Sequence, residues 1–194
     1  MNKNDLRYIK TEKIIKESFK KCVEKHGFEK VTVSMICAEG LISRNAFYLH
    51  FTDKYDLLDR LFDEFRASLL KNYDQNITES VAKNDVLTST KLYAEAILNN
   101  RLDFLFLIKC SRNKMDKVIK EIIIDYPNKK TIKNYEKICE NFDVQLNIRY
   151  MFTAMVAYTE LWFENFEKIS KEEAIYNLYK LCESPTTLFR NYFI

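Results

Sequence analysis

The chain has 194 residues, of which 47% are hydrophobic, and it contains only 2 glycines and 2 prolines. This composition excludes a disordered chain, and the shortage of glycine, proline and alternating β-branched runs predicts an all-α fold. No apolar run approaches the roughly 20 residues that span a bilayer, and the N-terminus is too polar for a signal peptide, so we expect a cytoplasmic protein.

The formal net charge of +3 is unevenly distributed along the chain. Residues 1–60 hold 12 Lys and Arg against 9 Asp and Glu, a net of +3, whereas residues 61–194 hold 19 of each, a net of zero. Because the whole excess lies in the N-terminal part, we expect that part to bind a polyanion.

The first predicted helix runs from about Tyr8 to Lys25, and Gly27 ends it. Its apolar residues recur at i, i+1, i+4 and i+5, which predicts one buried stripe along the helix. Phe28, directly after the glycine, is expected to pack beneath the elements that follow.

Residues 32–54 predict two short helices joined by a tight turn, a shape that fits the major groove of DNA. Thr32 can cap a helix over about residues 33–39, and Ser43 can cap a second helix that ends near Phe51.

The turn between these helices contains Gly40, Leu41 and Ile42. Glycine readily takes the left-handed conformation that a tight turn needs, so we expect Gly40 to take it. The two apolar residues after it are expected to pack inward.

The second of these helices has an unusual exposed face. At 100° per residue, Phe47 and Phe51 fall on one side and can be buried together, while Asn45 and Leu49 fall opposite, with Arg44 in the first turn. Asn and Arg can read base edges, and an apolar tip can touch a thymine methyl group. An ordinary helical hairpin with a mixed polar face explains the same pattern.

The stretch from residue 36 to residue 58 resembles the recognition-helix signature of the tetracycline-repressor (TetR) family. The Phe-Tyr-x-His-Phe core, followed by Asp-Lys and Leu-Leu, carries the resemblance. The resemblance implies that Tyr48, His50 and Lys54 hold DNA phosphates and that Arg44 and Asn45 reach bases. The full set of expected DNA-binding residues is Thr32, Ser43, Arg44, Asn45, Tyr48, Leu49, His50 and Lys54.

Two positions depart from the family's pattern. Leu41 stands where most members have glycine, which puts the geometry of the turn in doubt. Ala46 stands where many members have threonine, so one contact from a hydroxyl to a phosphate is expected to be missing.

A fourth helix, capped by Thr52 or Asp53, is predicted to run to about Tyr73 and to link two domains. We predict a DNA-binding domain of three helices over residues 1–55 and a larger helical domain for effector binding and dimerisation over residues 56–194. Residues 74–84 are polar and are expected to form a loop.

The C-terminal part predicts further helices. Leu102–Ile108 is almost wholly apolar and is therefore expected to be buried on all sides at the domain centre, and Pro185 is expected to stop the last helix. The other predicted spans are Asp85–Asn100, Lys114–Ile124 ended by Pro127, a basic helix to about Asn141, Val144–Glu167, and a helix opened by a capping box at Ser170.

The last two helices carry more apolar surface than one small domain can bury, which suits a two-fold interface between identical chains; one large core is the alternative. Aromatic and methionine side chains also suit a pocket for an apolar effector, although ordinary core packing explains them equally. The candidates are Tyr93, Phe104, Ile108, Met115, Phe152, Met155 and Tyr158.

The sequence contains no pattern typical of a metal site, a cofactor site or an enzyme. The five cysteines show no Cys-x-x-Cys pair, and with 2 histidines no zinc spacing arises, so we expect reduced core thiols and no metal or cofactor. A redox-sensing role for one of the cysteines is the alternative. No nucleophile pair or glycine-rich phosphate loop indicates an enzyme. We therefore predict a ligand-responsive homodimeric repressor on an operator in double-stranded DNA. The alternative is a helical protein-interaction module without specific DNA binding.

Overall fold

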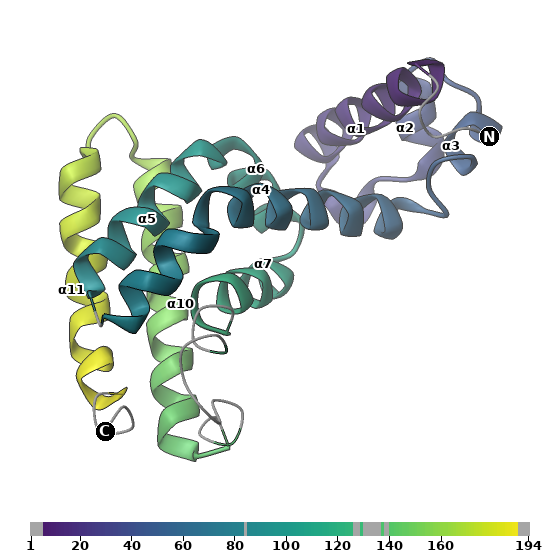
Figure 1. Cartoon of the computed structure of the whole chain (residues 1–194). Helices are drawn as coiled ribbons and strands as arrows, with labels where there is room; N and C mark the ends of the chain where they lie inside the picture. The colour runs from purple at the N-terminus through teal and green to yellow at the C-terminus, as the bar shows by residue number, and fades with distance from the viewer. Residues whose placement is uncertain (1–5, 84, 126–128, 130–136, 138–139, 190–194) are drawn as a thin grey trace. The chain divides into compact units, whose positions relative to one another are not determined.

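The computed structural model describes residues 6–83, 85–125, 129, 137 and 140–189, and all regular structure within them is helical, as predicted (Figure 1). The chain divides into two compact units, residues 1–64 with 106–111, and residues 65–105 with 112–194. No helix among the described residues has both the length and the hydropathy needed to cross a membrane. The functional division predicted between residues 55 and 56 stays a prediction.

The first unit contains the predicted helix-turn-helix. Its elements are α1 (Leu6–His26), the short η1 (Phe28–Lys30), α2 (Val33–Glu39), α3 (Arg44–Tyr48) and the start of α4 (Lys54–Ala82). Gly27, with a φ of 76°, ends α1 as predicted, and α2 packs against both α1 and α3. A core of fully buried side chains holds these elements together, among them Ile15, Phe19, Ile36, Phe47 and Leu57.

The turn between α2 and α3 differs from the prediction. Gly40 has an ordinary right-handed backbone, with a φ of −87°, and Leu41 takes the left-handed conformation with a φ of 51°. A Cβ atom on Gly40 would lie 2.7 Å from Ser18 Oγ and 3.1 Å from Ile14 Cγ2. Glycine is therefore needed at position 40 because α1 approaches closely. Leu41 is 94% exposed, so the prediction that it packs inward was wrong.

Helix α4 extends well beyond the predicted end near Tyr73, and the loop predicted over residues 74–84 is wrong up to Ala82. Asp53 caps the helix, because its Oδ1 accepts hydrogen bonds from the backbone N–H groups of Tyr55 and Asp56, each at 2.8 Å. Ile77 and Ser80 are buried despite their polar surroundings in sequence. Their packing keeps this stretch helical, which local pattern could not reveal.

The second unit is built on α5 (Val86–Asn99), α7 (Arg112–Lys120), the short π-helix η2 (Glu121–Asp125), α10 (Phe142–Glu164) and α11 (Lys171–Phe189). Helix α11 packs against α5 and α10, and Figure 1 shows α10 and α11 side by side. The predicted cap at Ser170 is confirmed, because its Oγ accepts a hydrogen bond from the Glu173 N–H. Asp85 also caps a helix, since its Oδ1 accepts a hydrogen bond from the Thr88 N–H at the start of α5. The helix predicted between Pro127 and Asn141 falls largely outside the described residues.

Two further predictions were wrong. Leu102, in the first turn of α6 (Arg101–Cys110), is 79% exposed, so this helix is not buried on all sides. Its opening turn lies at the surface, while Phe104 and Leu107 are buried. Pro185 does not stop α11, which continues to Phe189. Proline removes one backbone donor, but its fixed φ is compatible with a helix.

Four of the five cysteines are buried free thiols, as predicted, and Cys139 lies outside the described residues. Burial raises the pKa of both Cys110 and Cys182 to about 12. Their thiolate forms are therefore scarce near neutral pH, which argues against a redox role for these two.

We predict that Leu41→Gly stabilises the protein by about 1 kcal/mol, because it relieves a left-handed backbone and removes a side chain that packs against little. Urea unfolding should show the midpoint move upward with an unchanged slope. Gly40→Ala should instead destabilise by about 1–3 kcal/mol through its close contact with α1. A lower midpoint for Leu41→Gly would contradict the assignment of strain to position 41.

Candidate nucleic-acid interface

One N-cap residue and two buried aromatic side chains hold helix α3 in place. The Oγ of Ser43 accepts a hydrogen bond from the Ala46 N–H at 3.1 Å, as predicted. Phe47 and Phe51 are buried together, with ring centroids 5.9 Å apart. The helix ends at Tyr48, earlier than predicted, because the next turn tightens: the N–H groups of residues 50 and 51 both bond to the Phe47 carbonyl.

The side of α3 opposite its anchors faces outward. Arg44 and Asn45 are exposed, and Tyr48 and Leu49 are each about half exposed. Arg44 donates a long hydrogen bond of 3.5 Å to the Tyr48 hydroxyl one turn later. The structure therefore brings four of the candidate residues onto one outward face, with two hydrogen-bonding groups, one phenol and one apolar tip.

Thr32 stands at the N-terminus of α2, as predicted. Its Oγ1 accepts a hydrogen bond from the Met35 N–H at 3.3 Å, and the residue is exposed. Like Ser43, it serves as a cap, and its hydroxyl proton is not used in that bond. Both caps therefore keep a donor that a phosphate oxygen could accept from.

Lys54 has partners that the sequence did not indicate. Its ammonium donates to the carbonyl oxygens of Phe28, at 3.0 Å, and Glu29, at 2.9 Å. It also lies 4.7 Å from the centre of the Phe28 ring. A cation in the first turn of α4 opposes the helix dipole, and these carbonyls account for it. The predicted phosphate contact from Lys54 stays a prediction.

His50 is turned inward. Its side chain is 2% exposed, its ring centroid lies 3.9 Å from that of Tyr8, and its Nδ1 lies 3.8 Å from Glu12 Oε2. Burial lowers the pKa of His50 below its ordinary value, although the Glu12 carboxylate acts in the opposite direction. The imidazole is therefore neutral near pH 7 in the free protein. Its phosphate contact also stays a prediction.

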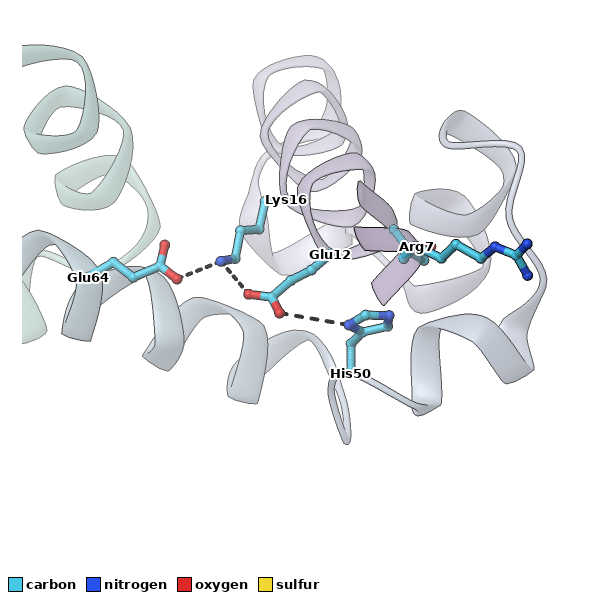
Figure 2. A network of polar contacts seen from close by, with 6 residues as sticks. Arg7, Glu12, Lys16, His50 and Glu64 are labelled. Atoms are coloured by element: carbon cyan, nitrogen blue, oxygen red, sulfur yellow. Dashed lines mark hydrogen bonds and ion pairs between the residues drawn. The ribbon is translucent and has the colours of Figure 1, made fainter. Parts of the chain in front are cut away.

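A line of polar contacts joins His50 to α1 and α4 (Figure 2). The Lys16 ammonium lies 2.6 Å from Glu12 Oε1 and 2.5 Å from Glu64 Oε1. Burial would raise the pKa of the Glu12 carboxyl, but the hydrogen bond and charge of Lys16 outweigh it and lower that pKa. Sequence reasoning missed this network. Only the i, i+4 spacing of Glu12 and Lys16 could have indicated part of it.

The seven pocket candidates are mostly core residues. The Tyr93 hydroxyl lies 2.7 Å from Thr159 Oγ1 in a fully buried pair, and burial raises the pKa of Tyr93. The Tyr158 hydroxyl accepts a hydrogen bond from Asn177 at 2.8 Å. The candidates that are buried are Tyr93, Phe104, Ile108, Met115, Phe152 and Met155, and of these Ile108 belongs to the first unit. An effector pocket among them stays a prediction.

One comparison with known proteins concerns the helix-turn-helix. A family model described as bacterial regulatory proteins of the tetR family matches residues 20–61, which include α2 and α3. No sequence among the curated proteins matches the chain. Among described residues, no group of three or more His, Cys, Asp or Glu could hold a metal ion.

Two solved structures resemble the chain along most of its length. The dihydroxyacetone kinase operon activator DhaS matches with a TM-score of 0.50 and 19% identity over 95% of this chain and 98% of that one. A TetR-like transcriptional regulator from Rhodococcus sp. RHA1 matches with a TM-score of 0.50 and 14% identity over 88% of this chain and 92% of that one. At these identities the likeness concerns the fold.

The contacts of Lys54 predict a structural effect independent of DNA. Lys54→Met should lower the free energy of unfolding by about 1–3 kcal/mol, because two backbone carbonyl groups lose a charged donor. Lys13→Met should change it by less than about 0.5 kcal/mol, since the Lys13 side chain is 77% exposed. Denaturant unfolding of both variants measures the difference, and equal stabilities would show that the Lys54 contacts contribute nothing.

Proposed function

We propose that the chain belongs to the tetR family of bacterial regulatory proteins and that it is a homodimeric transcriptional repressor, which a small-molecule effector releases from its operator. As a member of that family it would be a DNA-binding regulator and not an enzyme. The observation that carries the proposal is the outward face of α3, where Arg44, Asn45, Tyr48 and Leu49 are exposed above buried anchors.

Each group on this face suits a different part of a duplex. A guanidinium can donate two hydrogen bonds to guanine, and a carboxamide can exchange two with adenine. The apolar tip of Leu49 suits a thymine methyl group, and the Tyr48 hydroxyl suits a phosphate oxygen. Because Arg44 and Asn45 lie in the first turn of α3, the N-terminal end of that helix would enter the major groove.

The dimer would form through the outer face of α10. Phe142, Leu146, Tyr150 and Leu161 are each at least half exposed. At 100° per residue they fall within an arc of about 100°, so they make one apolar stripe along the helix. A stripe of this kind suits an isologous contact with a second copy, and Tyr176 on α11 is exposed as well. A two-fold dimer fits a palindromic operator.

Effector binding is proposed for residues 56–194, with the DNA-binding domain in residues 1–55. An effector can release the operator only if it binds more tightly to a conformation that fits the operator poorly. The solved structure named as an operon activator shares the fold, so transcription in vitro must decide whether the operator is repressed or activated. Either role would place the protein in the cytoplasm with the chromosome.

Selection from random duplex DNA at near-physiological salt tests the proposal. We expect enrichment of a palindrome bound far more tightly than bulk DNA. Arg44→Ala and Asn45→Ala should each cost about tenfold to a hundredfold in affinity and relax the preferred sequence at one position. Tyr48→Ala should weaken binding to all sequences alike. Lys117→Ala in α7 is the control: it removes a charge from the second unit and should change neither the affinity for DNA nor the preferred sequence.

Failure of the selection would favour the alternative function. If no sequence is enriched and binding is weak and strongly salt-dependent, the chain is a helical protein-interaction module whose α10 face binds a partner protein. Enrichment of a sequence that Arg44→Ala and Asn45→Ala leave unchanged would instead show that another surface reads DNA.

The α10 stripe predicts the oligomeric state. The double substitution Leu146→Lys and Leu161→Lys should convert a dimer into a monomer of 23.2 kDa, because charges would face each other across the axis. Sedimentation equilibrium measures the mass. Leu102→Lys is the control, since Leu102 is an exposed leucine on α6 and not on α10. A wild-type monomer, or a double variant that still dimerises, would contradict the proposed interface.

A further inference from the structure

His50 is a buried titratable group that follows the recognition helix. It follows α3 by two residues, and its side chain is 2% exposed. Its Nδ1 is buried and has no hydrogen-bond partner, although the Glu12 Oε2 atom lies 3.8 Å away. That separation is too long for a hydrogen bond and short enough for one to form with a small movement.

The charged groups around His50 act on its protonation in both directions. From α1 come the Tyr8 ring, the Glu12 carboxylate and the Lys16 ammonium; from α4 come Glu64, paired with Lys16, and Arg60, whose charge acts on Glu12. Glu12 is the ionised group next to the imidazole, so an imidazolium would find a ready partner. Desolvation of the ring is the larger cost that opposes it, and the positive charge of Lys16 opposes it as well.

Bound DNA would change this balance. Phosphates bring a dense negative potential to the surface of α3, and a charge within about 10 Å is only partly screened at physiological salt. The imidazolium would be stabilised by the phosphates outside and by Glu12 inside. Its Nδ1–H would then donate a charge-assisted hydrogen bond to Glu12, with a length of about 2.7–2.9 Å.

We propose that His50 takes up a proton when α3 engages DNA and closes onto Glu12, so that affinity for DNA rises as the pH falls. Lys16 and Glu64 are positioning residues, because they hold the Glu12 carboxylate beside the ring. The hydrogen bond between His50 and Glu12 would connect α1 to the residues that follow α3. It would therefore hold the C-terminal end of the recognition helix in place. This inference rests on the proposed function and adds a pH-dependent regulation to it.

The sign follows from proton linkage. If the complex binds more protons than the free protein, lower pH favours the complex. The effect begins below the pKa of His50 in the complex and ends below its pKa in the free protein, which lies under the ordinary value. Between these limits affinity rises by up to about tenfold per pH unit for each protomer.

Proton NMR of the full chain tests the uptake directly. The chain has only 2 histidines, and His26→Gln assigns their two ring signals. We expect the titration midpoint of His50 to rise when the selected duplex is added. An equal His50 midpoint with and without the duplex would overturn the inference.

Binding profiles between about pH 5.5 and pH 8 complete the test. Affinity of the wild-type protein and of His26→Gln should rise together as the pH falls. His50→Gln should give a flatter profile, and Glu12→Gln, which keeps the shape of the side chain, should reduce the slope without abolishing binding at pH 8. Circular dichroism checks that both variants are folded.

The two proposals fail in different ways. If no duplex is bound at any pH, the proposed function is wrong and this inference is wrong with it. If the duplex is bound and His50→Gln keeps the wild-type pH profile, only the inference is wrong. A Glu12→Gln variant with a full wild-type slope would remove Glu12 from the assignment.

Discussion

The burial of Phe47 and Phe51 is the contact on which the recognition surface depends. These rings sit in the core of the first unit, so α3 needs only five residues to be held firmly. A helix this short has no independent stability in water. Truncating either ring would cost about 3–5 kcal/mol, and the orientation of Arg44 and Asn45 would be lost with it. The exposed residues of α3 would contact DNA, and the two buried rings set the orientation of these residues.

The parts of this unit that could be predicted from sequence are local. Thr32 and Ser43 cap their helices through N–H groups three residues away, and Gly27 ends α1 by its own backbone. Such features lie within a few residues of one another, and their chemistry restricts the residue types strongly. The resemblance over residues 36–58 added DNA as the expected partner, and the family model over residues 20–61 covers the same region.

The parts that could not be predicted depend on contacts between distant residues. The role of Gly40 is decided by Ser18 on another helix, so the glycine did not indicate where the backbone turns left-handed. Lys54 and His50 look like exposed residues in the sequence. In the structure the Lys54 ammonium donates to the Phe28 carbonyl oxygen, and the His50 Nδ1 faces the Glu12 carboxylate. The helical stretch near Ile77 is polar in sequence, and its packing alone reveals it. In each case the deciding neighbour is many residues away.

The buried thiols can report how often each unit of the protein opens. Cys22 and Cys37 lie in the first unit and Cys182 in the second, and burial raises the pKa of all three. An alkylating reagent can therefore reach them only when the surrounding helices open transiently. The rate at which each thiol reacts measures how often its own unit opens, without any label being introduced. A ligand that holds one unit closed would slow the reaction of that unit's cysteines and leave the others unchanged.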